Sequence, residues 1–177
     1  MARLANLLPV VSLVCAGLLA GPAAAQDDLS FDPGPAERCM AAAGGNAQAM
    51  QACIGQAADG CMQQSDMAQT TYGMGFCFDQ ELRYWDGRLN AAYQQVRARD
   101  KAIDAEMEQL GSAAPRLAPA VRDMQRAWIT FRDASCDYER AQWGNGTGGG
   151  PAALLCMMRL TGQQALVLES RLRNGYN

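Results

Sequence analysis

Two stretches of the chain decide its fold: DGRLNAAY at residues 86–93 and QRAWITFRDASC at residues 125–136. In both, polar and aromatic residues recur at intervals of three and four positions, which places their side chains on one face of an α-helix. The residues that share a face are Asp86, Asn90 and Tyr93 in the first stretch, and Gln125, Trp128 and Arg132 in the second. The two stretches therefore predict two helices that are joined by a turn and run antiparallel.

Charged residues of these two helices are expected to meet across their seam. We expect Arg132 to pair with Asp86 and Asp133 to pair with Arg88, because a guanidinium–carboxylate fork sets the register of two helices. Two interpretations of this polar cluster stay open. In the structural one it only holds the helices together, and in the functional one part of it faces a partner.

Apolar residues at alternating spacings of three and four extend the helical pattern over most of the chain. The first stripe follows Thr70 and Thr71 and consists of Phe78, Leu82, Trp85, Leu89, Ala92 and Val96. The second consists of Leu117, Val121, Met124, Trp128, Phe131, Ser135 and Tyr138, and the third of Leu154, Met158, Thr161, Ala165, Leu168 and Leu172. Glycine-containing breaks at 111–115 and 145–150 separate them. The fold class is therefore predicted as all-α, a bundle of three main helices stapled by disulfides.

A small N-terminal helical hairpin is expected in front of the bundle. Residues 26–35 are polar and proline-containing, which is typical of a disordered leader. A short helix should follow and end at Gly44 and Gly45. Asn46 is a suitable N-cap for a second helix, which we expect to continue to Gly60. The segment 26–60 is thus predicted as leader plus hairpin, ahead of a domain at 61–177.

The first 25 residues have the pattern of a secretory signal peptide. Arg3 precedes an apolar run at 4–19, and Ala23, Ala24 and Ala25 form a cleavage site before Gln26. The run is too short to span a bilayer comfortably, so no stable membrane insertion is expected after cleavage. Lipidation of Cys15 is the alternative. We predict a periplasmic or secreted protein.

Charge and cysteines narrow the class of protein further. Without Arg3, the 15 Lys and Arg residues become 14 against 18 Asp and Glu, a net charge of −4, which disfavours nucleic acid and favours a cationic partner. The secreted chain keeps an even number of cysteines, which behind a signal peptide indicates a disulfide framework with 15 possible pairings. They are Cys39, Cys53, Cys61, Cys77, Cys136 and Cys156. Zinc is the alternative, but the chain has no C-x-x-C motif and no histidine.

The two stretches, written D-x-x-L-N-x-x-Y and Q-R-x-W-x-x-[FY]-R-D-x-x-C, resemble the signature of the LprI-type lysozyme inhibitor domain. That family consists of small secreted bacterial helical proteins, and the resemblance covers about residues 61–176. The signature residues in this chain are Asp86, Leu89, Asn90, Tyr93, Gln125, Arg126, Trp128, Phe131, Arg132 and Asp133. The resemblance implies that Cys61 pairs with Cys77 and Cys136 with Cys156. Cys39 and Cys53 then remain for each other.

The resemblance also implies a function, namely binding of a cationic lysozyme or another cell-wall hydrolase. In this hypothesis the bundle is a rigid scaffold, and the loop at 143–150 enters the partner's cleft with Trp143 as anchor and Asn145 beside it. The alternative hypothesis is a cell-envelope interaction module that shares the fold without inhibiting lysozyme.

Catalysis is not expected, and no metal or cofactor is predicted. The absence of histidine excludes Ser-His-Asp and Cys-His sites. Carboxylates remain as candidates for glycosidase acid–base chemistry, although charged residues on helices are usually just solvated. They are Asp79, Glu81, Asp86, Asp133 and Glu139.

Overall fold

The computed structural model describes residues 29–175, and this part of the chain contains helices and loops but no strand. The expected signal peptide and Cys15 lie outside the described residues. None of the described helices is both long and apolar enough to cross a membrane.

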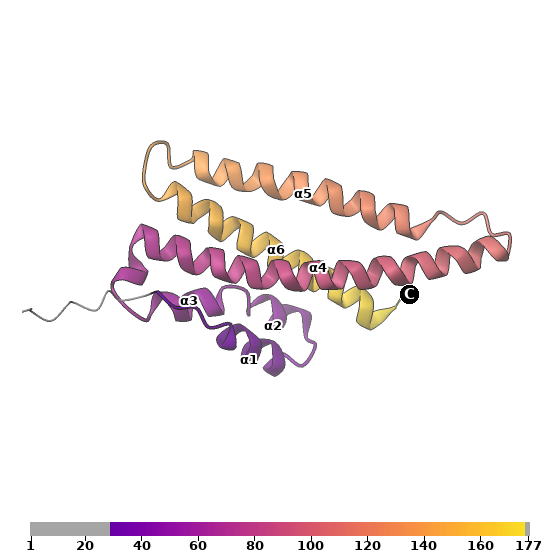
Figure 1. Ribbon diagram of the computed structural model, residues 1–177, viewed down its shortest axis with the longest axis horizontal. Helices are drawn as coiled ribbons and strands as arrows, with labels where there is room; N and C mark the ends of the chain where they lie inside the picture. Colours follow the sequence, from indigo (N-terminus) through magenta and orange to yellow (C-terminus); the bar gives the residue numbers. More distant parts are fainter. Residues whose placement is uncertain (1–28, 176–177) are drawn as a thin grey trace, which may run out of the picture.

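Three long helices form the bundle: α4 (Thr71–Gln109), α5 (Leu117–Ala141) and α6 (Gly149–Asn174). Helix α5 runs antiparallel to α4, and α6 returns in the direction of α4 (Figure 1). Helix α6 packs against both α4 and α5. Its middle turns are buried on several sides, from Thr161 and Gly162 through to Leu168. This disulfide-held helical architecture confirms the predicted fold class.

Helix α4 begins where the sequence predicts it, because the Thr70 side chain accepts a hydrogen bond from the Gly73 N–H at 3.1 Å. Its predicted stripe faces the core. Phe78, Trp85, Leu89, Ala92 and Val96 are buried, and Leu82 is half-buried. The helix continues without interruption through the buried Asp100 to Gln109.

Helix α5 begins at Leu117 and holds Pro119 in its first turn, where proline is tolerated. The predicted stripe of this helix is wrong in its C-terminal half. Phe131 and Tyr138 are 60% and 67% exposed, whereas Gln125 and Cys136 are buried. An α-helix repeats every 3.6 residues, so a face assigned at 3.5 drifts away from the core over 25 residues. The disulfide of Cys136 to α6 selects the observed face.

The N-terminal helices are α1 (Gly34–Ala42), α2 (Ala47–Gln51), α3 (Gln56–Met62) and the 3-10 helix η1 (Met67–Gln69). Figure 1 shows α1, α2 and α3 gathered along one side of α4. Asn46 caps α2 as predicted, accepting from the Ala49 N–H at 2.9 Å. The predicted single helix to Gly60 is wrong, because the chain turns at Gly55, with φ of 104°, and α3 then runs through Gly60.

Part of the expected leader is ordered. Phe31 packs against the core cluster, and the Ser30 hydroxyl donates to the Gln64 side-chain oxygen at 2.7 Å. The disulfides are the three pairs expected from the resemblance: Cys39–Cys53, Cys61–Cys77 and Cys136–Cys156. The first joins α1 to the segment after α2, the second joins α3 to α4, and the third joins α5 to α6.

Candidate functional site

Three signature residues belong to the interior of the bundle. Leu89 is 3% exposed, and Trp128 is half-buried against the core cluster. Gln125 is buried, and its side-chain oxygen accepts a hydrogen bond from the Gln164 Nε2 at 3.0 Å. These residues hold α4, α5 and α6 together, as the structural interpretation of the signature expects.

The expected salt bridges across the α4–α5 seam are not formed. Asp86 accepts a hydrogen bond from the Asn90 Nδ2 at 2.9 Å on its own helix. Arg132 donates to the adjacent Asp133 through Nε at 2.9 Å and Nη2 at 2.8 Å, and its guanidinium lies 5.0 Å from the Trp128 ring centroid. Arg132 and Asp133 pair with each other on α5 because this helix packs against α6 as well as α4, so that its inner face is not directed at α4 alone.

Arg88 instead pairs with Glu169 of α6. Its Nε and Nη2 donate to the two carboxylate oxygens, each at 2.9 Å, and its Nη1 donates to the Tyr84 hydroxyl at 3.0 Å. The guanidinium also lies 5.1 Å from the centroid of the Trp85 ring. Burial by itself lowers the pKa of Arg88, but the hydrogen bonds to Glu169 and Tyr84 outweigh it and raise that pKa. This bidentate pair joins α4 to α6.

Glu81 is fully buried and has a structural role. Its Oε1 accepts from the Gly55 N–H at 2.7 Å and from the Trp85 Nε1–H at 2.8 Å, and its Oε2 accepts from the Ala58 N–H at 2.6 Å. Gly55 is the N-cap residue of α3 and has no side chain to cap that helix. Glu81 therefore caps α3 from the neighbouring helix. The other candidate carboxylates remain on the surface or beside an arginine, as with Asp79 and Arg83.

Asp104 has a similar role at the opposite end of the bundle. Its two carboxylate oxygens accept from the Leu117 and Ala118 N–H groups, at 2.7 and 2.9 Å, and so cap the start of α5. Burial by itself raises the pKa of Asp104, but these backbone hydrogen bonds and the nearby Arg116 together lower it. Sequence reasoning missed this residue, although an aspartate on the apolar side of α4 was a signal for it.

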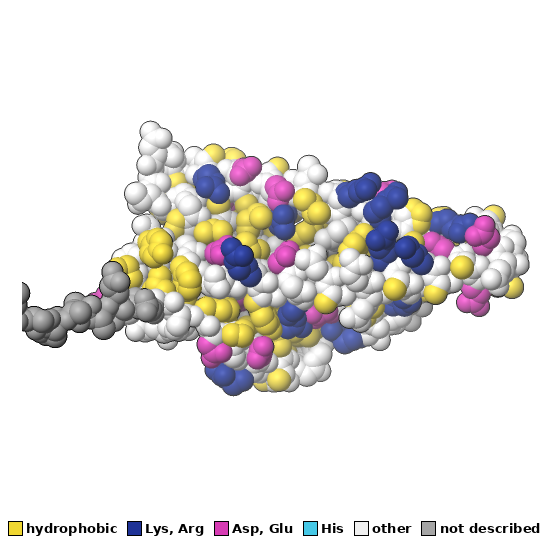
Figure 2. Space-filling view, in the orientation of Figure 1, with side chains coloured by type: hydrophobic (Ala, Val, Ile, Leu, Met, Phe, Trp, Pro, Cys, Tyr) yellow, Lys and Arg dark blue, Asp and Glu magenta, His cyan; other side chains and the backbone are white. Residues whose placement is uncertain are grey.

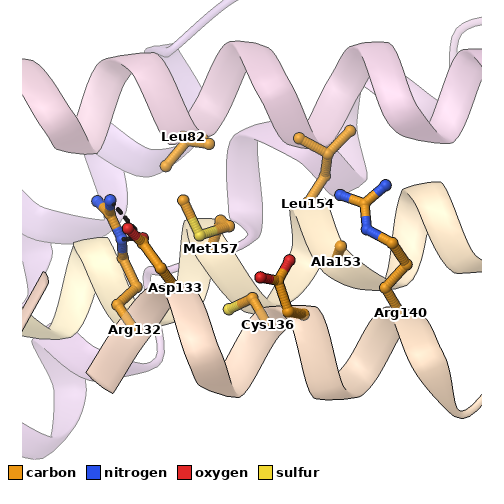
Figure 3. Close-up of a pocket in the computed structure, with 9 residues that line it drawn as sticks. Leu82, Arg132, Asp133, Cys136, Arg140, Ala153, Leu154 and Met157 are labelled. Atoms are coloured by element: carbon orange, nitrogen blue, oxygen red, sulfur yellow. Dashed lines mark hydrogen bonds and ion pairs between the residues drawn. The ribbon is translucent and has the colours of Figure 1, made fainter. Parts of the chain in front are cut away.

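The end of the bundle where α5 meets α6 carries two surface grooves, one on each side of α5. The first has a volume of ≈ 440 Å³ and is shown in Figure 3. Arg132 and Asp133, joined to each other, lie at one end of it and Arg140 at the other. Between them the floor is apolar, with Leu154 and Met157 from α6.

The second groove, which we call the aromatic groove, has a volume of ≈ 530 Å³. Phe131 and Trp143 are 60% and 54% exposed along it. Its remaining lining comes from α5 and α6 and includes Leu155, Leu160, Glu139 and Arg159. Exposed aromatic side chains over an apolar floor are a surface suited to protein contact.

The loop at 142–148 presents Trp143 in a defined position. The Trp143 carbonyl accepts from the Gly146 N–H at 2.8 Å, and Gly144 takes a φ of 54° to close the turn. The Trp143 ring lies so close to Gly148 that a β-carbon there would clash with it. Asn145 is exposed at the turn. The loop is thus a compact turn within the segment that the Cys136–Cys156 disulfide closes.

Four signature residues, the buried Gln125 among them, line a third groove between α4 and α5, of ≈ 310 Å³. They are Asn90, Tyr93, Gln125 and Arg126, and Arg97, Arg122 and Ile129 complete the lining. The sequence predicted that these two stretches lie side by side, but it did not single out Arg97 or Arg122.

Comparison with known proteins matches this chain to lysozyme inhibitor LprI over residues 61–168. An uncharacterized 17.7 kDa protein in the puhA 5′ region of Rhodobacter capsulatus is 31% identical over 133 residues, which are 75% of this chain and 81% of that protein. An uncharacterized protein, R02472, of Rhizobium meliloti strain 1021 is 29% identical over 107 residues, which are 59% of this chain and 75% of that protein. No solved structure matches significantly. The family match covers both signature stretches and four of the paired cysteines, and the chain belongs to the lysozyme inhibitor LprI family.

Proposed function

We propose that this chain acts outside the cytoplasm, where it binds a lysozyme or a related cell-wall hydrolase and blocks peptidoglycan hydrolysis. Membership of the lysozyme inhibitor LprI family carries this proposal. Three disulfides among the described residues support an oxidising compartment. The proposed contact surface is the aromatic groove together with the turn that carries Trp143 and Asn145.

The physical chemistry of that surface supports an inhibitory contact. A few residues buried by the partner supply most of the binding energy at protein interfaces, and tryptophan is enriched among them. Trp143 and Phe131 are the large exposed aromatic residues of this groove. The Cys136–Cys156 disulfide and the packing of Trp143 on Gly148 hold the surface in place before binding. Less side-chain and loop entropy is then lost when a complex forms.

Charge supports the choice of a cationic partner. The chain from Gln26 onward has a net charge of −4 from 14 basic and 18 acidic residues. An acidic inhibitor and a basic enzyme attract each other before contact, which raises the association rate at low salt. We therefore expect the association rate to fall as the ionic strength rises.

The decisive experiment titrates the oxidised chain from Gln26 onward against c-type, g-type and i-type lysozymes with a cell-wall substrate. Saturable inhibition of one class at near-stoichiometric amounts is the expected result. Replacing both Trp143→Ala and Asn145→Ala should weaken inhibition by about 2–4 kcal/mol, on the order of 30-fold to 1,000-fold. The matched control is Leu110→Ala, another exposed apolar residue (70% exposed), in the loop at the other end of the bundle.

Each part of the proposal has its own contradicting result. Equal inhibition by the wild type and the Trp143 and Asn145 double variant would show that another surface makes the contact. A folded, helical protein that inhibits none of the three classes would contradict the inhibitor function itself. The chain would then be a cell-envelope interaction module that shares the fold.

A further inference from the structure

The groove between α4 and α5, which we call the arginine groove, concentrates positive charge on an acidic protein. Arg97 lines it from α4, and Arg122 and Arg126 line it from α5. Figure 2 shows Lys and Arg side chains gathered over this part of the α4–α5 seam. The gathering does not reflect an excess of basic residues, since acidic residues outnumber basic ones, 18 to 15, in the whole chain.

Two of the three guanidinium groups form no hydrogen bond and no ion pair in the described part of the chain. Arg122 donates to Asp123 at 2.9 Å. The side chains of Arg97 and Arg126 form neither a hydrogen bond nor an ion pair with any residue in 29–175. The Asp123 carboxylate also interacts electrostatically with Arg126, so one carboxylate offsets part of the charge of the three guanidinium groups and leaves a net positive charge in the groove.

The three guanidinium groups repel one another, and Asp123 offsets this repulsion only in part. Arg122 and Arg126 are four residues apart on α5, a spacing at which like charges destabilise a helix. Arg97 adds a third positive charge from the facing helix. An anion in the groove would remove the repulsion and gain charge-assisted hydrogen bonds from both helices.

The other residues that line the groove indicate the chemistry of the rest of the ligand. The Tyr93 ring and Ile129 offer apolar contact, and Asn90 and Gln125 complete the polar part of the lining. The volume of ≈ 310 Å³ is at the lower end of the range for small-molecule sites. A groove of this size can hold one anionic group attached to a small organic molecule, but not a long polymer.

We propose that the arginine groove is a binding site for a small ligand that carries a phosphate or carboxylate group, with Arg97 and Arg126 as the residues that contact the oxyanion. Arginine is suited to this role because its planar fork matches the geometry of both anions. The site is separate from the aromatic groove, since it lies on the α4–α5 seam rather than between α5 and α6. The proposal therefore does not depend on lysozyme inhibition.

The test is isothermal titration calorimetry at low ionic strength with the oxidised chain from Gln26 onward. The probes are inorganic phosphate, N-acetylglucosamine 1-phosphate, N-acetylmuramic acid as the carboxylate, and neutral N-acetylglucosamine. We expect at least one anionic probe to bind with a Kd below about 1 mM, and the neutral sugar to bind at least about tenfold more weakly. The preferred anion then identifies the source as phosphate or carboxylate.

The double variant Arg97→Gln with Arg126→Gln should weaken anion binding by about tenfold or more. Its matched control is Arg38→Gln with Arg83→Gln, which removes the same charge from exposed positions outside the groove. Circular dichroism verifies that both variants are helical, and bound anion should raise the Tm of the control but not of the double variant. The proposal is overturned if no anionic probe binds with a Kd below about 1 mM, if the neutral sugar binds equally well, or if the two double variants bind the anion equally well.

Discussion

Replacing Glu81 by glutamine is the sharpest test of how this fold is held together. Glu81 is fully buried, and its carboxylate is held by three donors: the Gly55 N–H, the Ala58 N–H and the Trp85 Nε1–H. Glutamine has nearly the same shape but only one acceptor oxygen. If that oxygen still accepts from the Gly55 N–H and the Trp85 Nε1–H, the new NH₂ group faces the Ala58 N–H, so that two donors oppose each other.

Two opposing effects decide the size of the change. A charged group in the interior is costly, so its removal alone favours the variant. The loss of one hydrogen bond to a charged acceptor costs about 1.5–3 kcal/mol, and the unpaired buried N–H adds about 1–3 kcal/mol. Because all three donors already point at the carboxylate, we expect the losses to prevail. The expected net destabilisation of Glu81→Gln is about 3 kcal/mol, against a total stability of about 5–15 kcal/mol.

The assay is urea unfolding of the oxidised protein, followed by circular dichroism, with a thermal melt beside it. A loss of about 3 kcal/mol corresponds to a Tm lower by about 9 °C in a chain of this size. Glu106→Gln, an exposed glutamate on the same helix, is the matched control and should change stability by less than about 0.5 kcal/mol. A Glu81→Gln protein as stable as wild type would refute the reasoning, since the cost of the buried charge would then equal the value of its hydrogen bonds.

Three further predictions concern the ion pair of Arg88 with Glu169, the Asp104 cap and the Cys136–Cys156 disulfide. Replacing either Arg88 or Glu169 by alanine should lower the free energy of unfolding by about 3 kcal/mol. A double-mutant cycle should show a coupling energy of at least about 1 kcal/mol, and additive losses would contradict the bidentate pair. Asp104→Asn should lower the Tm at pH 7. Because the pKa of Asp104 is lowered on folding, the difference in Tm between wild type and variant should shrink as the pH falls below 3.8. A Tm difference that grows below this pH would contradict the assigned role of Asp104. Replacing Cys136 and Cys156 by serine should cost about 3 kcal/mol in chemical unfolding and weaken any lysozyme inhibition, since the Trp143 turn loses its clamp.

Periodicity predicted the long helices well, because their signals are local. The apolar stripe that follows Thr70 and Thr71 and the breaks at 111–115 and 145–150 each depend on residues a few positions apart in the chain. The same local reasoning failed at Gly55. A glycine inside an apolar pattern is compatible with a continuous helix, and the turn is stabilised by the Glu81 carboxylate, 26 residues away, which accepts from the Gly55 N–H.

The partners of charged residues were the least predictable part of the candidate site. The signature residues were correctly assigned to facing helices, but Arg132 and Asp86 each found a partner on their own helix. Phe131 and Tyr138 were assigned to the core and lie on the surface, where Phe131 lines the aromatic groove. A heptad count cannot locate the exposed face of a long helix, because the error accumulates with each turn.

The sequence by itself determined the three long helices, the charge balance and the family, because propensity, patterning and composition can be read from the chain without its tertiary contacts. The tertiary structure alone decided which side chains meet across the bundle. Arg88 pairs with Glu169 over a separation of 81 residues, and Glu81 caps a helix that has no cap of its own. It also placed Arg97 beside Arg126 in one groove. Such contacts depend on the rotation and register of packed helices, which are set by the fit of the whole core and by no segment alone.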